Sequence, residues 1–562
     1  MWGIDRLLRL ADISRVDHLP VVAAFCRRIR VREAINGVVP NQMQVDVGTI
    51  GEALVLDTLS GRSPLYRLSS FFQHQPSEPL LGRPIAPTHF NDTTVGRALD
   101  AIFEAGAEKV FNHVAWQAAR LFPLDLREVH FDTTSVNVWG DVYAPRPGVA
   151  AVHLTHGYSK DHRPDLKQFL IRMLCAGGNV PILGGCEDGN ASDKTVNHGV
   201  LTRISQHLAR YGLKQGDFLY VADSALVTEE NLEAVGANFF LTRLPFTYSE
   251  AGRMVAQAVL QKQWESVGEL HLTRATTRRP AASYSVCEKS VTLYGQTYRA
   301  VVVRSTAHDK RRQKRLDRQI RESEGAARRQ ADQHSKIEFF CRPDAEAALQ
   351  RLQAADHQLH RLEISIRDQP HYAPGRPPVK GPRAIAFMRW ALDITVLEDR
   401  ESIQRQREEA GCFVLLTNVP RQGDRSRTGA ELLRSYKDQY GIERNYSFLK
   451  DPLIVNDLFL KRPERIEALG AVLLIALLVW NLIEHTLRRW VQQHNTDLPG
   501  WENRPTRRPT AFMMSNKFQG LQILTSGQLR RLTRPLNDQQ QLYLQALSLS
   551  ELDLGLTVAQ PG

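Results

Sequence analysis

The order of predicted elements between residues 126 and 244 limits the possible folds more than any other feature. Apolar runs, a Gly-Gly-Asn turn and capping residues predict a strand, a β-hairpin, a helix, a strand, a helix and a strand. These elements are expected at about 128–135, 166–187, 192–212, 218–222, 228–236 and 238–244. Such an alternation is typical of an α/β domain. In this order, we expect the first and fourth strands to be parallel neighbours.

Two of these strands end in an aspartate. Asp132 follows the apolar start of the first strand, in HFDTTS, and Asp223 ends the fourth, in YVADSA. Parallel neighbouring strands would bring both carboxylates to one edge of the sheet, where they repel. Oxygen ligands of this kind suit Mg²⁺ or Mn²⁺. Either acid alone is more typical of a strand exit with a local side-chain hydrogen bond, but the pair in this element order favours a metal site.

A third acid is predicted on a helix over 428–450. Tyr436, Gln439, Glu443 and Lys450 stand at offsets of 0, 3, 7 and 14, which places them in one stripe. Glu443 could then face the two aspartates and complete a two-metal site for phosphoryl displacement. The alternative is an ordinary surface helix with polar neighbours.

The charge of the chain indicates a polyanionic partner. The 562 residues carry a net charge of +11, with a pI near 9.4, which favours nucleic acid or a membrane surface. Residues 304–329 hold ten Lys/Arg against four Asp/Glu, and residues 486–534 hold nine against two. These segments lack a strong apolar opposite face, which argues against a membrane surface. Six scattered cysteines without a C-x-x-C pair argue against a zinc module or disulfide scaffold and for a reducing cytoplasm.

Three further segments carry structural signals. Apolar residues at helical spacing predict a mostly helical region before residue 122. The apolar run 468–483 has 16 residues, too few to span a bilayer, and is predicted to be a buried helix. The Pro/Gly-rich segment 371–382 is predicted to be a linker.

Several phrases resemble the bacterial insertion-sequence DDE transposases. One large group of that family surrounds its third acid with a signature of Tyr, two residues, Arg, three residues, Glu, six residues and Lys. The phrase YKDQYGIERNYSFLK matches at Tyr436, Glu443 and Lys450 and departs at Gln439, where the signature has Arg. HGYSKDHRPDLKQ, GCEDGNASDK, VADSALVTEENL and FLTRLP are also similar. LSGRSPLYRLSSFF and VGRALDAIFEAG resemble the N-terminal accessory domain of one subfamily.

The resemblance implies an α/β fold: a ribonuclease-H-like mixed sheet with flanking helices, interrupted by a large α+β insertion and preceded by a mostly helical N-terminal domain. The expected parts are an accessory or DNA-binding domain at 1–122, the two parts of the catalytic domain at 123–245 and 416–490, the insertion at 246–415 and a basic C-terminal region at 491–562. The interval of 220 residues from Asp223 to Glu443 leaves room for such an insertion.

The same resemblance implies a transposase that cleaves insertion-sequence ends and joins the 3′-OH ends to target DNA. Asp132, Asp223 and Glu443 would hold two Mg²⁺ (or Mn²⁺) ions. The expected partners are double-stranded DNA and a second copy of the chain, in the cytoplasm. Contacts to DNA are expected from Tyr436, Gln439, Lys450, Arg243, Lys160 and Arg163. Two alternatives remain open: a metal-dependent nuclease without strand transfer, and an inactive DNA-binding descendant of a transposase.

Overall fold

The chain is an α/β protein that forms two compact units in a computed structural model. The structure describes residues 12–60, 67–140, 143–161, 163–270, 281–306, 310–354, 359–376, 381–450 and 460–557. Unit 1 consists of Met1–Thr242, Thr417–Val419 and Arg434–Gly562. Unit 2 consists of Arg243–Leu416 and Pro420–Leu433, and so contains the region where the insertion is predicted.

Unit 1 contains mixed strands in the order β4-β3-β2-β5-β6, except that the last two residues of β6 fall in unit 2. These strands are β2 (Glu128–Val138), β3 (Lys167–Ala176), β4 (Val180–Glu187), β5 (Leu219–Val221) and β6 (Phe239–Leu244). β2, β3 and β4 are antiparallel, whereas β5 pairs parallel to both β2 and β6. The sequence prediction of three antiparallel strands followed by a strand parallel to the first is therefore confirmed.

Local signals set the turns and helix starts around this sheet. Gly177, Gly178 and Asn179 join β3 to β4, and all three have positive φ, which favours the Gly-Gly-Asn sequence found there. The side chain of Ser192 caps α9 (Asp193–Ala209), and that of Thr228 caps α10 (Glu229–Ala234). Each of these features was expected from the sequence.

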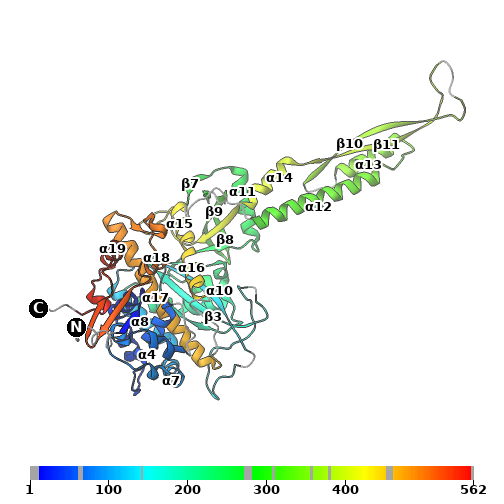
Figure 1. Cartoon of the computed structure of the whole chain (residues 1–562). Coiled ribbons are helices and arrows are strands. Elements are labelled where there is room, and N and C mark those ends of the chain that lie inside the picture. The colour runs from blue at the N-terminus through cyan, green and yellow to red at the C-terminus, as the bar shows by residue number, and fades with distance from the viewer. Residues whose placement is uncertain are drawn as a thin grey trace. The chain divides into compact units, whose positions relative to one another are not determined.

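The long helix α17 (Pro463–His494) forms the centre of unit 1 (Figure 1). It packs against β4 and three N-terminal helices, α4 (Val47–Ser60), α7 (Asp92–Ala105) and α8 (Ala107–Leu121). α17 is long and apolar enough to cross a membrane, but 94% of its most apolar window is buried inside the protein. The prediction of a buried helix is confirmed, although the helix has 32 residues and extends beyond 468–483 at both ends.

Both ends of the chain belong to unit 1. β1 (Asp12–Arg15) pairs with β15 (Gln522–Ser526), which also pairs with β16 (Leu529–Leu532). The N-terminal and C-terminal helices contribute to the same hydrophobic core as α17. These remaining helices are α2 (Leu19–Arg28), α3 (Val31–Val38), α5 (Leu68–His74), α6 (Ser77–Leu81), α18 (Ala511–Lys517) and α19 (Asp538–Ala546), and a short hairpin is formed by β13 (Leu498–Pro499) and β14 (Pro505–Thr506).

Unit 2 combines antiparallel strands with charged helices. Its strands β7 (Glu265–Glu269), β8 (Ser283–Leu293), β9 (Gln296–Ser305) and β12 (Cys412–Thr417) follow the order β12-β9-β8-β7. Its helices are α11 (Ser249–Gln261), α12 (Lys310–His334), α13 (Arg342–Gln353) and α14 (Arg400–Ala410). A long antiparallel pair, β10 (His360–Tyr372) and β11 (Ile385–Glu398), also belongs to this unit. Of the linker predicted at 371–382, the first two residues end β10, residues 373–376 and 381–382 lie outside helices and strands, and residues 377–380 lie outside the described residues.

Candidate functional site

Asp132 and Asp223 occupy matching positions on the two parallel strands. The last paired residues of β2 and β5 are His130 and Val221, and each aspartate follows two residues later. The two carboxylates are therefore placed at the edge where β5 ends. One expectation is wrong: Asp132 does not end its strand, because β2 continues to Val138 through its pairing with β3. Asp223 does leave its strand, and its Oδ1 accepts a hydrogen bond of 3.1 Å from the amide of Ala225.

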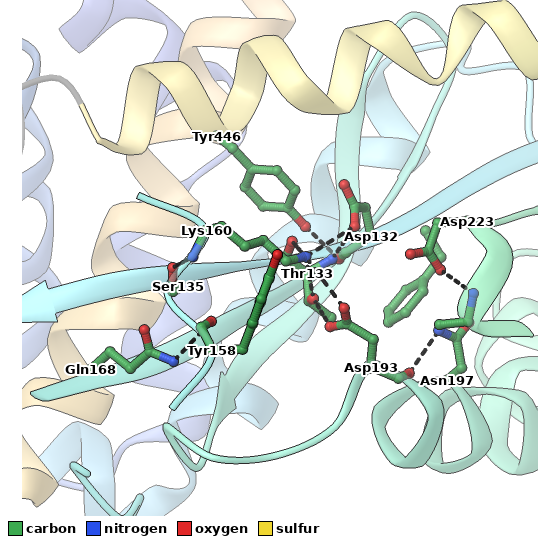
Figure 2. A network of polar contacts seen from close by, with 12 residues as sticks. Asp132, Thr133, Ser135, Tyr158, Lys160, Gln168, Asp193, Asn197, Asp223 and Tyr446 are labelled. Carbon is green, nitrogen blue, oxygen red and sulfur yellow. Dashed lines mark hydrogen bonds and ion pairs between the residues drawn. The ribbon is translucent and has the colours of Figure 1, made fainter. Parts of the chain in front are cut away.

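A third aspartate, Asp193, joins this group although the sequence did not single it out. It is the first residue of α9, and its Oδ1 accepts a hydrogen bond from the hydroxyl of Thr133 on β2 (Figure 2). Asn197 holds this end of α9 in place: it donates to the carbonyl of Asp193 at 2.8 Å and accepts from the buried Tyr220 hydroxyl at 3.0 Å. One sequence signal could have indicated Asp193. The N-cap of α9 follows the β3–β4 hairpin, so the first residue of this helix starts close to the sheet.

Lys160 points into the same group of acids. Its Nζ donates hydrogen bonds to the carbonyl oxygen and Oγ1 of Thr133, at 2.6 and 3.0 Å. The same Nζ lies 3.6 Å from Asp132 Oδ1 and 3.6 Å from Asp193 Oδ2 (Figure 2). Lys160 was predicted to contact DNA, and no observation tests that role; in this structure its ammonium group faces the carboxylates.

Burial and the repulsion of neighbouring carboxylates raise the pKa values of Asp132 and Asp223. Burial raises the pKa of Asp132 to about 7; the ammonium of Lys160 opposes this shift, while the charges of Asp223 and Asp193 add to it. The pKa of Asp223 is also raised, by burial first and by the charge of Asp193 second. Perturbed carboxylates that converge on one sheet edge are characteristic of functional sites. Their oxygen atoms are the donors that a hard divalent cation prefers.

The helix predicted over 428–450 is divided at Gln439. It forms α15 (Gly429–Asp438) and α16 (Tyr440–Leu449), and the Gln439 amide lies 3.5 Å from the carbonyl of Phe131. Gln439 keeps helical backbone angles (φ −56°, ψ −23°), so the interruption is limited to this one residue. α16 packs on β2, where the hydroxyl of Tyr446 donates to the main-chain carbonyl of Asp132.

Glu443 lies on this second helix, three residues before Tyr446, and is exposed. Within the described ranges, no three Asp, Glu, His or Cys side chains form a group that could hold one metal ion. The charges of Asp223 and Asp193 lie near enough to Asp132 to raise its pKa, but neither these three aspartates nor Glu443 form a ready three-ligand group. The donor chemistry suits Mg²⁺, and the role of Glu443 stays a prediction.

A glycine permits the close approach of α16 to the sheet. A Cβ atom at Gly441 would overlap the side chain of Asn179 in the β3–β4 turn. A glycine inside a helix costs about 1 kcal/mol relative to alanine. The close approach to Asn179 explains why a glycine stands here despite this cost, because a Cβ atom fits only if the Asn179 side chain or the helix shifts.

The other residues that were predicted to contact DNA each have a different set of neighbours. Lys450, at the end of α16, forms an ion pair of 2.7 Å with Asp161 in the loop that carries Lys160. The guanidinium of Arg163 pairs with Asp165 at 2.7 Å and stacks on Trp139. Tyr436 is half-buried on α15 in unit 1, whereas Arg243 belongs to unit 2 and stacks on Phe413 at 5.3 Å.

One comparison with known proteins gives a match. Residues 11–116 match a family model described as a domain of unknown function, DUF4277, which is found in transposase-like proteins. The matched region covers the N-terminal helices, from β1 into α8, and ends before the sheet that carries Asp132. A search of curated proteins finds no match to the chain.

Proposed function

We propose that this protein is a DNA transposase whose catalytic domain has a ribonuclease-H-like fold. The observation that carries the proposal is the matching position of Asp132 and Asp223 on parallel neighbouring strands, within the order β4-β3-β2-β5-β6. The match of residues 11–116 to a domain of transposase-like proteins supports the same class independently of the site.

In this proposal, Asp132, Asp223 and Glu443 hold two Mg²⁺ or Mn²⁺ ions at the edge of the sheet. When bound, such ions stabilise the attacking and leaving oxygen atoms of an in-line phosphoryl displacement. The matching positions of Asp132 and Asp223, two residues after the last pair of β2 and β5, support this assignment. The side chain of Glu443 would reach them from α16, which the hydrogen bond from Tyr446 holds next to Asp132.

The reaction consists of two displacements at phosphorus. Water first attacks a phosphodiester at the end of the element, which leaves a free 3′-OH on one side and a phosphate on the other. That 3′-OH then attacks a phosphodiester of the target, so that one bond forms and the target strand is broken. Protein side chains position these groups, and none of them serves as the nucleophile. The hydroxyl groups of Thr133 and Ser135 have hydrogen-bond partners of their own: Thr133 donates to Asp193, and Ser135 accepts from the amide of Lys160.

The proposed partner is double-stranded DNA, bound by two copies of the chain that pair two ends in the bacterial cytoplasm. The net charge of +11 supports a polyanionic partner. Tyr436, Gln439 and Lys450 would follow the DNA beside the site. Further phosphate contacts are proposed for Lys160, Arg163 and Arg243.

A cleavage and joining assay tests the proposal. The substrate is a plasmid that carries the DNA flanking the coding sequence, incubated with Mg²⁺ or Mn²⁺. Wild-type protein should release the element and give products joined to a target plasmid. Asp132→Asn and Glu443→Gln should abolish both products, whereas the matched control Asp92→Asn, at an exposed position on α7, should keep them.

Each outcome of this assay separates the possible functions. Cleavage without joined products would indicate a metal-dependent nuclease. Binding of the ends without cleavage would indicate an inactive descendant of a transposase. Normal cleavage by Asp132→Asn would show that the assignment of the site is wrong.

A further inference from the structure

A single ammonium group serves two carboxylates in the candidate site. Lys160 Nζ lies 3.6 Å from an oxygen of Asp132 and 3.6 Å from an oxygen of Asp193, and its hydrogen bonds to Thr133 hold it between them. The Thr133 hydroxyl in turn donates to the second oxygen of Asp193. The ammonium is therefore bound in a small, organised set of oxygen atoms, as Figure 2 shows.

The loop that delivers Lys160 is anchored from several sides. The amide of Lys160 donates to Ser135 Oγ at 3.1 Å, which fixes its backbone against β2. The buried side chain of Gln168 on β3 donates to the carbonyl oxygens of Tyr158 at 3.3 Å and Gly189 at 2.7 Å. A Cβ atom at Gly189 would overlap main-chain oxygens, so the strands and this loop pack closely. The position of Lys160 is thus built into the fold.

The negative charges of the three aspartates explain why a cation lies between them. Asp132, Asp193 and Asp223 carry a formal charge of −3 when ionised, and Lys160 contributes +1, which leaves −2. The side chains of Asp132 and Asp193 are 21% and 32% exposed, so water screens their repulsion only in part. One divalent cation would neutralise the remaining charge of −2. Until such an ion binds, the Lys160 ammonium is the positive charge next to Asp132 and Asp193.

We propose that Asp193 is a further acid of the metal site and that Lys160 is a tethered cation that competes with a divalent ion. Lys160 neutralises Asp132 and Asp193 before an ion binds, and its flexible four-carbon chain allows the ammonium to withdraw when an ion arrives. The proposal rests on the proposed function in one respect, namely that Asp132 and Asp223 bind a divalent cation.

The test measures Mn²⁺ binding to the full-length chain without DNA. Titration calorimetry gives the dissociation constant, and scanning calorimetry gives Tm with and without Mn²⁺. Lys160→Met keeps the length of the side chain and removes the charge. We expect its dissociation constant for Mn²⁺ to be lower by about tenfold, since a cation a few ångströms from the site no longer repels the ion. We also expect a lower Tm without metal and a larger rise of Tm on adding Mn²⁺.

Two further variants complete the experiment. Lys194→Met removes a positive charge at an exposed position next to Asp193 in the sequence, and it should leave Mn²⁺ affinity within about twofold of wild type because exposed charges are screened. Asp193→Asn should weaken Mn²⁺ binding by about tenfold or more, since it removes one negative charge from the site. This variant keeps the test decisive if Lys160→Met does not fold.

The proposal is overturned if Lys160→Met binds Mn²⁺ with wild-type affinity, or if Asp193→Asn does so. An equal loss of Tm with and without Mn²⁺ in Lys160→Met would also overturn it, because that result indicates a purely structural lysine. Wild-type protein that binds no Mn²⁺ would refute the metal site itself. Normal Mn²⁺ binding by wild type with unchanged affinity in both variants would refute only the roles of Lys160 and Asp193.

Discussion

The acid site of unit 1 and the basic helix α12 of unit 2 use charge in opposite ways. The acid site brings Asp132, Asp193 and Lys160 together from a strand, a helix start and a loop, and holds them partly buried by specific hydrogen bonds. The charges of α12 are mostly exposed along one element, with surface pairs such as Arg328–Glu324 at 2.7 Å. Partly buried charges therefore act through their exact positions, whereas exposed charges act through their total number.

The largest expected effect is a loss of DNA cleavage on changing Asp223, where the position of the carboxylate matters more than its charge. Asp223→Glu keeps the charge but moves the carboxylate by about one methylene. We expect DNA cleavage to fall at least about a hundredfold, because a misplacement of about 1 Å has that effect on a positioned reaction. The cleavage assay measures this, and circular dichroism checks the fold. A variant with near wild-type cleavage would break the contrast with α12, where Arg→Lys replacements should change little.

The next effect concerns the stability of the protein as a function of pH. The pKa of Asp132 is raised from 3.8 to about 7 in the folded state, so the folded protein keeps a proton that the unfolded chain releases. This contribution to stability is fully present below about pH 4 and is lost as the pH rises through 7. Without divalent ions, wild type should lose about 2 to 3 kcal/mol more than Asp132→Asn between pH 5 and 8.

Urea unfolding at the two pH values measures this difference. Equal losses in wild type and in Asp132→Asn would show that Asp132 ionises like an exposed aspartate. The contrast between a buried acid site and an exposed basic helix would then lose its physical basis.

A smaller effect is expected at the contact that sets the position of α16. Gly441→Ala adds a Cβ that overlaps the side chain of Asn179. The strain of about 1 to 3 kcal/mol exceeds the gain of about 1 kcal/mol from a better helix residue, so a net destabilisation of about 1 kcal/mol is expected. Adding Asn179→Gly should restore the stability, because it removes the obstructing side chain at a position whose φ is 77°. Urea unfolding of the single and double variants measures both steps.

The comparison also shows which parts of the site were readable from the sequence. The positions of Asp132 and Asp223 followed from local signals: apolar strands of defined length and the Gly-Gly-Asn turn of a hairpin. These signals predict that β2 and β5 are parallel neighbours, and the structure confirms it. The positive charge of residues 304–329, most of which lie in α12, was equally readable, because it follows from a count of the sequence.

The rest depended on contacts between distant segments. Asp193 and Lys160 meet only because α9 and a loop return to the same edge of the sheet, and no periodicity within either segment indicates this meeting. The break at Gln439 was missed because the apolar spacing of α15 and α16 is nearly continuous along the sequence. The core that the N-terminal helices share with α17 likewise joins segments more than 300 residues apart.

The smallest effect per residue is expected on α12, where charge should act through its sum. Replacing one exposed arginine, such as Arg321, by glutamine should change the affinity for a generic DNA duplex by less than about threefold. Replacing Arg315, Arg321 and Arg329 together should reduce the slope of log affinity against log salt by up to about 0.9 for each lost phosphate contact. Fluorescence anisotropy without divalent ions measures binding separately from cleavage. The matched control replaces Arg400, Arg405 and Arg407, which are exposed on α14. An unchanged slope would exclude α12 from DNA binding, and an equal change in both triple variants would show that only the total charge of unit 2 matters.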